Sequence, residues 1–175
     1  MDSAKLNLTA TYSRMEEAIL SLESPDEILE ACLSVIIEEL ETERGFIMLY
    51  DSNFDELNVF AAHNIDPDTI FTTAEVSQTI LNSVYHECKP IMSYNALDDP
   101  RFSEKSSVVI SGLRSILCVP ITVQEGLLGV VYVDDRLRIG AFDQRQLQFL
   151  CECSKKLSEI MCKVFPEIKP KAFKK

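Results

Sequence analysis

The sequence predicts an α+β domain whose central, mainly antiparallel sheet has five to six strands. Residues 115–121 and 127–133 are apolar at nearly every position, and the short turn Gln124-Glu125-Gly126 between them is typical of a β-hairpin, with Gly126 supplying positive φ. Strands without apolar–polar alternation have both faces covered. Helical patterns stand before, between and after the strands, so we expect three layers: helices on one face, and a helix plus an irregular loop on the other.

Two amphipathic helices are expected at the start of the chain. Ser24 is placed as an N-cap, Pro25 as the first helical residue and Glu27 as the capping-box partner, so a second helix begins there and runs to about residue 40. The first helix has the four-three-four-three spacing of a heptad repeat, formed by Leu8, Tyr12, Met15, Ile19 and Leu22.

The middle of the chain is expected to form strands around a single helix. Residues 46–50 and 57–63 predict a hairpin, because a polar turn separates two apolar runs. Residues 74–88 show apolar residues at helical spacing, and residues 91–94 can form an edge strand.

A long loop and a final helix complete the predicted elements. The loop, residues 95–113, is expected to hold a short helix near residues 106–110, and long structured loops are usually functional. Asp143 and Gln146 predict a capping-box start for a helix that continues to about residue 165. This helix carries its own heptad-like stripe of Leu147, Leu150, Ser154, Leu157, Met161 and Val164.

These elements divide the chain into three parts. Residues 1–23 are expected to be a heptad-like dimerisation helix and residues 24–162 the folded domain. Residues 163–175 are read as a linker or tail toward a downstream output domain, or as a frayed terminus. Because the first helix lies outside the compact unit, we favour self-association as a homodimer over packing within one chain. Candidate dimerisation residues are Leu8, Tyr12, Met15, Ile19, Leu22, Leu150, Leu157, Met161 and Val164.

Composition excludes several classes of protein. The 175 residues are 46% hydrophobic without a run of eighteen apolar residues, which predicts a single ordinary core and no membrane span. A net charge of −11 argues against a nucleic-acid partner. The first residues lack the layout of an export signal, so a cytoplasmic location with six reduced, core-type cysteines is expected.

Seven short motifs then follow one another along the chain: Ser24-Pro25-Asp26, Arg44-Gly45-Phe46, residues 76–80, Asp99-Pro100-Arg101-Phe102, residues 112–120, residues 129–134, and Phe142. In this order and spacing they resemble the GAF domain, a small-molecule sensor module of signalling proteins. The resemblance spans about residues 24–161. It implies a ligand pocket enclosed by the third helix and the long loop. It also implies dimerisation through flanking helices and an output domain, such as a cyclase, kinase or transcriptional activator, in cis or in trans.

We therefore expect a sensory domain that is not an enzyme, with a small molecule as its ligand. Cyclic AMP or cyclic GMP is the first expectation, because a helix start near residues 72–78 can offer N–H groups to a phosphate. Against it, Asp135-Arg136 and Gln146-Leu147 stand where cyclic-nucleotide-binding members often carry Asn-Lys and Asp-Glu. Candidate ligand-binding residues are Phe60, Val76, Ser77, Ile80, Asn95, Asp99, Arg101, Phe102, Val109, Ser115 and Leu117.

Two alternatives belong to other classes of protein. One is a ligand-free structural dimerisation module whose pocket is filled by side chains such as Phe102 and Phe60. The other is a methionine sulfoxide reductase-type enzyme, which is less favoured because residues 94–114 contain no cysteine. No catalytic set or metal site is expected, since Asp98-Asp99 and Asp134-Asp135 fit turn and strand-end polarity.

Overall fold

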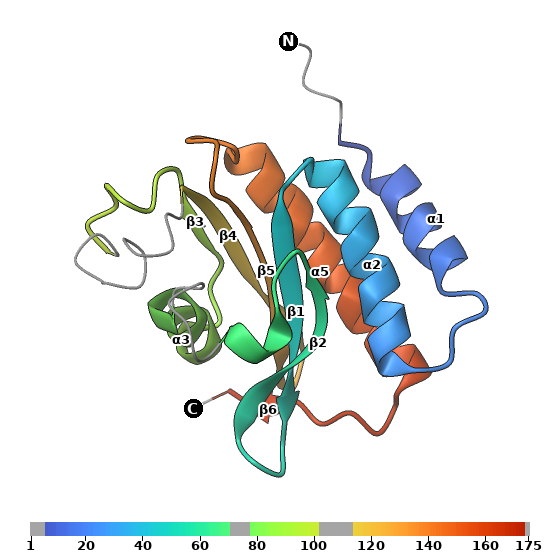
Figure 1. Cartoon of the computed structure of the whole chain (residues 1–175). Coiled ribbons are helices and arrows are strands. Elements are labelled where there is room, and N and C mark those ends of the chain that lie inside the picture. Colours follow the sequence, from blue (N-terminus) through green and yellow to red (C-terminus); the bar gives the residue numbers. More distant parts are fainter. Residues whose placement is uncertain (1–5, 71–77, 102–113, 174–175) are drawn as a thin grey trace.

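The computed structural model describes residues 6–70, 78–101 and 114–173 (Figure 1). Its elements are α1 (Leu8–Ala18), α2 (Pro25–Leu40), β1 (Arg44–Asp51), β2 (Glu56–His63), the 3-10 helix η1 (Pro67–Thr69), α3 (Gln78–Glu87), β3 (Ile91–Ser93), β4 (Ser115–Val123), β5 (Gly126–Asp135), α5 (Gln144–Val164) and β6 (Lys171–Ala172). The helices and strands predicted for these residues occur in the expected order, with η1 and β6 as additions, and the short helix expected near residues 106–110 lies outside the described residues.

The strands form a six-stranded sheet in the order β2-β1-β5-β4-β3, with β6 as a further partner of β5. Every pairing is antiparallel, so the predicted α+β class and sheet are confirmed. β1 pairs with β5 only from Gly129 to Asp134. β6 takes up the edge of β5 that β1 leaves open, at Gly126 and Leu127.

The helices cover the two faces of the sheet unequally (Figure 1). α1, α2 and α5 lie together on one face, whereas α3 lies on the other. Alternate residues of β1 point to different layers, since Ile47 and Leu49 join the core under the three helices while Phe46 and Met48 join the core beside α3. Two apolar layers therefore sandwich the sheet, which is why its central strands show no alternation in sequence.

The predicted helix starts are confirmed by their caps. The Ser24 hydroxyl accepts a hydrogen bond from the Glu27 backbone N–H at 3.2 Å, with Pro25 in the first turn. At α5, Asp143 and Gln146 form a reciprocal capping box, in which the Asp143 N–H donates to Gln146 Oε1 at 2.9 Å. These short-range signals place both helices without help from the tertiary fold.

The structure corrects the expectation that the first helix is surplus to the core. α1 ends at Ala18 rather than near Ser24. Met15 is completely buried, and the Tyr12 hydroxyl donates to the backbone carbonyl of Glu152 in α5 at 3.1 Å. Four candidate dimerisation residues, namely Met15, Leu150, Leu157 and Met161, are thus core residues of a single chain, and Leu8, Tyr12, Ile19 and Leu22 pack partly buried beside them.

The segment after α5 also differs from its prediction as a linker, because it docks on the domain. Phe165 and Ile168 pack against the core under the three helices, and Lys171 enters β6. Gly126 lies in β5 and does not have the positive φ expected of it. A Cβ at this position would lie 2.0 Å from the Lys171 carbonyl oxygen, so glycine permits the close approach of the tail.

Candidate functional site

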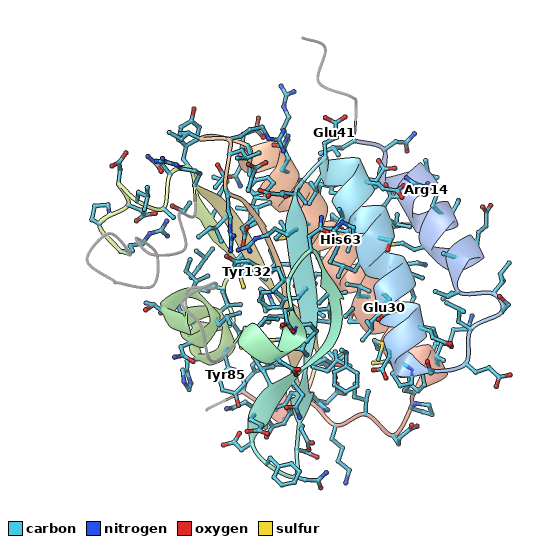
Figure 2. The ribbon with its side chains drawn as sticks, viewed as in Figure 1. Arg14, Glu30, Glu41, His63, Tyr85 and Tyr132 are labelled. Carbon is cyan, nitrogen blue, oxygen red and sulfur yellow. The ribbon has the colours of Figure 1, made fainter. Side chains whose placement is uncertain are left out.

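The side of the sheet that α3 covers is where the predicted ligand site would lie. We call this surface the α3 face. Figure 2 labels Tyr132 over the middle of the sheet and Tyr85 on α3. From α3, Ile80, Leu81 and Val84 pack toward the same layer. The face is formed by completely buried side chains of three central strands: Phe46, Met48, Ile116, Cys118, Val130 and Tyr132.

A buried ion pair stands at one end of the α3 face. Arg44 of β1 and Asp134 of β5 are cross-strand neighbours, and Arg44 donates from Nε to Asp134 Oδ1 at 2.6 Å and from Nη2 to Oδ2 at 2.9 Å. Their side chains are 4% and 0% exposed. Such a bidentate pair is strong and geometrically specific. Burial raises the pKa of Asp134, and the hydrogen bonds from Arg44 limit that rise.

Tyr132 places a buried hydroxyl beside this pair. Its ring stacks on Phe46 with a centroid distance of 4.7 Å and an interplanar angle of 12°. The hydroxyl is buried near Asp134 but has no partner in hydrogen-bond geometry among the residues that the structure describes. Burial, followed by the charge of Asp134, raises the pKa of Tyr132 well above its ordinary value. The hydroxyl is therefore neutral, and Asp134 is the polar group beside it.

A hollow of about 390 Å³ opens at the opposite end of this face, between α3 and the β1–β2 hairpin. Met48, Leu57 and Leu81 give it an apolar floor, and Asp55, Glu56, Asn58, Asn82 and Tyr85 form a polar rim. A volume of this size falls at the small end of the range for small-molecule sites, roughly 300–1,000 Å³.

Of three predicted ligand residues on or near the central strands, the structure places one on the α3 face and two on the opposite face. Ile80 lies on the α3 face as predicted, but Phe60 and Leu117 pack toward α2 and α5. Phe60 is the extra residue of a bulge in β2, where the pairing with β1 shifts between Ile47 and Met48, and the bulge turns it to the helix side. Leu117 lies in β4, which is apolar on both faces, so the sequence does not show which of its side chains point to which layer.

Ser115, another predicted ligand residue, connects backbone segments through its hydroxyl. Its buried hydroxyl lies 3.1 Å from the Tyr94 carbonyl and 2.8 Å from the Arg138 carbonyl, and accepts from the Ala141 N–H at 3.0 Å. It joins three backbone segments at the end of β4. Four further candidates, Val76, Ser77, Phe102 and Val109, lie outside the described residues.

The remaining candidates, Asn95, Asp99 and Arg101, follow β3. Asn95 and Asp99 line a second hollow of about 440 Å³ together with Tyr94, Asp98 and Ile139. Asp99 accepts from the Ser93 hydroxyl at 2.8 Å, from the Arg101 N–H at 3.0 Å and from the Arg101 guanidinium. The hydrogen bond from the Arg101 side chain is the main cause that lowers the pKa of Asp99 to about 2. This network fixes the turn after β3.

Sequence reasoning missed the polar group formed by Arg44, Asp134 and Tyr132. None of the three was a candidate, although two motifs of the GAF resemblance contain them. The sequence did contain a signal that could have identified the ion pair. Arg44 and Asp134 are charged residues at the ends of strands predicted to be covered on both faces, and charged side chains in such a setting are buried only when paired.

Redox or metal chemistry has few suitable groups in the described segments. Cys118 lies on the α3 face, but burial raises its pKa, and the thiolate is the reactive form. Within those segments no three His, Cys, Asp or Glu side chains gather as a metal site would require. None of the helices described there combines the length and apolar character of a membrane span.

Comparison with known proteins identifies the fold and its relatives. The sequence model of the GAF domain matches residues 24–160, well over half of the chain. Hybrid signal transduction histidine kinase G of Dictyostelium discoideum is 31% identical over 72 residues, which are 41% of this chain but only 2% of that kinase. The chain thus corresponds to a very small part of this relative.

Solved structures share the fold at low sequence identity. The GAF domain of the Acinetobacter phosphoenolpyruvate-protein phosphotransferase has a TM-score of 0.72 and 18% identity, with 91% of this chain and 96% of that chain covered. Free methionine-R-sulfoxide reductase from Neisseria meningitidis, solved with its substrate, has a TM-score of 0.70 and 16% identity, with 91% and 90% covered.

Proposed function

The chain belongs to the GAF domain family, and on that premise we propose that it is a sensory domain that binds a small molecule at the α3 face and regulates an output domain. The observation that supports this proposal is the polar group of Arg44, Asp134 and Tyr132 within an apolar layer. The related histidine kinase is a signalling protein, which agrees with a regulatory role.

The polar group is not needed for packing. Replacing a buried ion pair by apolar residues of similar volume is often neutral or stabilising. A buried hydroxyl without a well-formed hydrogen bond costs about 1–3 kcal/mol, and that of Tyr132 makes none to the described residues. A ligand with a polar head would satisfy the hydroxyl and contact the guanidinium of Arg44 at the same place.

We propose cyclic AMP and cyclic GMP as the first ligands to test. A cationic side chain, Arg44, and an aromatic pair, Phe46 and Tyr132, are groups that bind a phosphate and a base respectively. The expected result is saturable heat in titration calorimetry and a rise in Tm, since a ligand at 100 times its Kd stabilises the folded state by about 2.7 kcal/mol.

Tyr132→Phe is the variant that tests the site. It removes only the hydroxyl, which makes no well-formed hydrogen bond to the described residues, so the fold should keep or slightly increase its stability while ligand affinity falls. Tyr94→Phe is the matched control, because Tyr94 is exposed and lies outside the α3 face. If neither nucleotide gave heat or a rise in Tm, the cyclic-nucleotide proposal would be contradicted, but the proposal of a small-molecule sensor would stand. If no member of a broad metabolite collection raised the Tm, the sensor itself would be contradicted.

A ligand-free structural module is the second candidate. The central-strand side chains of the α3 face are completely buried, and Phe46 stacked on Tyr132 fills space that a ligand would need. Phe60, one of the two predicted fillers, points to the other side of the sheet. This candidate predicts that no compound protects the wild-type protein against heat.

We also propose that the domain is not a reductase, although one solved relative is a methionine sulfoxide reductase. The buried, raised-pKa thiol of Cys118 on the α3 face supports this. Turnover of free methionine sulfoxide with a thiol reductant, lost in Cys118→Ser, would overturn it.

Self-association remains a proposal, and the surface that suits it is the groove between the C-terminal ends of α1 and α5. This groove of about 550 Å³ includes Ile19, Leu20, Ile160 and Val164, flanked by charged residues. Leu20 is 83% exposed. Leu20→Glu should shift a dimer to a monomer in light scattering, whereas Leu137→Glu, at an equally exposed site elsewhere, should not.

A further inference from the structure

The ammonium group of Lys171, in β6, is held by three residues of the opposite layer. Lys171 Nζ lies 3.1 Å from Asp55 Oδ1 and 3.7 Å from the centre of the Tyr85 ring, with the Tyr50 ring at 5.7 Å. A cation over an aromatic face is attracted by the ring quadrupole, and a nearby carboxylate adds to that attraction. We call Tyr50, Asp55 and Tyr85 the cation box.

The cation box is held together by its own hydrogen bonds. The Tyr50 hydroxyl donates to Asp55 Oδ1 at 3.1 Å, and the Tyr85 hydroxyl lies 3.1 Å from the Asp55 carbonyl and 3.2 Å from Oδ1. Its residues come from β1, from the β1–β2 turn and from α3. The box therefore exists only while α3 stays beside the hairpin.

The tail that carries Lys171 connects both layers of the domain. It leaves α5 on the helix side, where Phe165 and Ile168 pack, and crosses the sheet at the edge of β5 that β1 leaves open (Figure 1). The backbone approaches Gly126 so closely that a Cβ there would meet the Lys171 carbonyl at 2.0 Å. The Lys171 side chain then reaches α3 on the far side.

We propose that residues 165–173 are a latch that couples the position of α3 to the segment leaving α5. A shift of α3 moves Tyr85, opens the cation box, and frees β6 from β5. The chain after α5 then loses its anchor. The latch does not depend on the proposed ligand, so it can be tested on the protein alone.

The first test is hydrogen exchange of the intact protein followed by mass spectrometry. Lys171→Met should raise exchange in residues 165–173 by roughly 3- to 10-fold, because the cation is lost while the apolar stem remains. Lys171→Arg should restore protection, since guanidinium also stacks on aromatic rings. Lys169→Met is the matched control, an exposed lysine of the same tail that makes no ion pair with any described residue. Equal exchange in the Lys169 and Lys171 variants would overturn the proposal.

The second test asks whether α3 and the tail are coupled. Tyr85→Ala should raise hydrogen exchange in residues 165–173, although it alters no residue of the tail. Asn82→Ala, on the same helix, should leave that exchange unchanged. By reciprocity, Gly126→Ala, which displaces the tail backbone, should raise exchange in residues 78–87. In residues 165–173, the double variant Tyr85→Ala/Lys171→Met should exchange no faster than whichever single variant exchanges faster. The latch would be refuted by unchanged exchange in the tail of Tyr85→Ala or by unchanged exchange in α3 of Gly126→Ala. Additive effects in the double variant would refute it as well.

Discussion

Arg44 and Asp134 pair across β1 and β5 through two parallel hydrogen bonds inside an apolar layer. Loss of one partner should cost about 3–5 kcal/mol, because it leaves an uncompensated buried charge. We expect Arg44→Met and Asp134→Leu each to lower the free energy of unfolding by this amount in urea titrations, and the double variant to lose less than either.

Lys155→Ala provides the comparison for this prediction. It breaks a pair with Glu152 in which Lys155 is 65% exposed, so the free energy of unfolding should stay close to that of the wild type. Strictly additive losses in the Arg44/Asp134 double variant would show that the two side chains do not act as a pair.

Met15 tests whether α1 belongs to the core. Because its side chain is completely buried, Met15→Ala should lower the free energy of unfolding by about 2–5 kcal/mol. Leu20→Ala, just beyond α1 and 83% exposed, should stay within about 0.5 kcal/mol of the wild type. A Met15→Ala protein of unchanged stability would mean that α1 does not pack on the domain in solution.

Asp99 should give the domain a distinct sensitivity to acid. Its pKa of about 2 lies below the ordinary value of 3.8, so the charged form stabilises the folded state above about pH 4 and this stabilisation is lost as pH falls toward 2. After allowance for the exposure of Arg101, the effect is about 1–2 kcal/mol.

The corresponding measurement compares the wild type with Asp99→Asn by urea unfolding between pH 5 and pH 2. The difference in stability should be present at pH 5 and shrink toward zero at pH 2. A difference that stayed constant over this interval would assign the effect to the shape of the turn rather than to the charge.

Thiol labelling should separate the cysteines by burial. Cys162 is exposed and should react with a maleimide in the folded protein. Cys32, Cys118 and Cys153 are buried, and burial raises the pKa of each thiol, so they should react only after unfolding. Rapid labelling of Cys118 in the native state would indicate that the α3 face opens. A Cys162→Ser variant, labelled in parallel, checks the assignment.

Local sequence signals determined most of the secondary structure. Ser24-Pro25 and the Asp143/Gln146 pair act over three residues, so their helix starts are visible without any tertiary contact. The apolar runs on either side of Gln124-Glu125 likewise predicted the β4–β5 hairpin. The ordered motifs from Ser24 to Phe142 were sufficient to predict the GAF family, which the family match to residues 24–160 then confirmed.

Only the tertiary structure decided which layer each side chain enters. A strand buried on both sides has the same apolar composition on each face, so Leu117 and Ile116 could not be distinguished, and a single bulge turned Phe60 away from the predicted site. The heptad of α1 fits a partner helix and the chain's own α2 and α5 equally well, and packing within the chain buries Met15. The docking of the tail depends on contacts between residues far apart in sequence, Lys171 with Asp55 and Tyr85, and no local pattern encodes them.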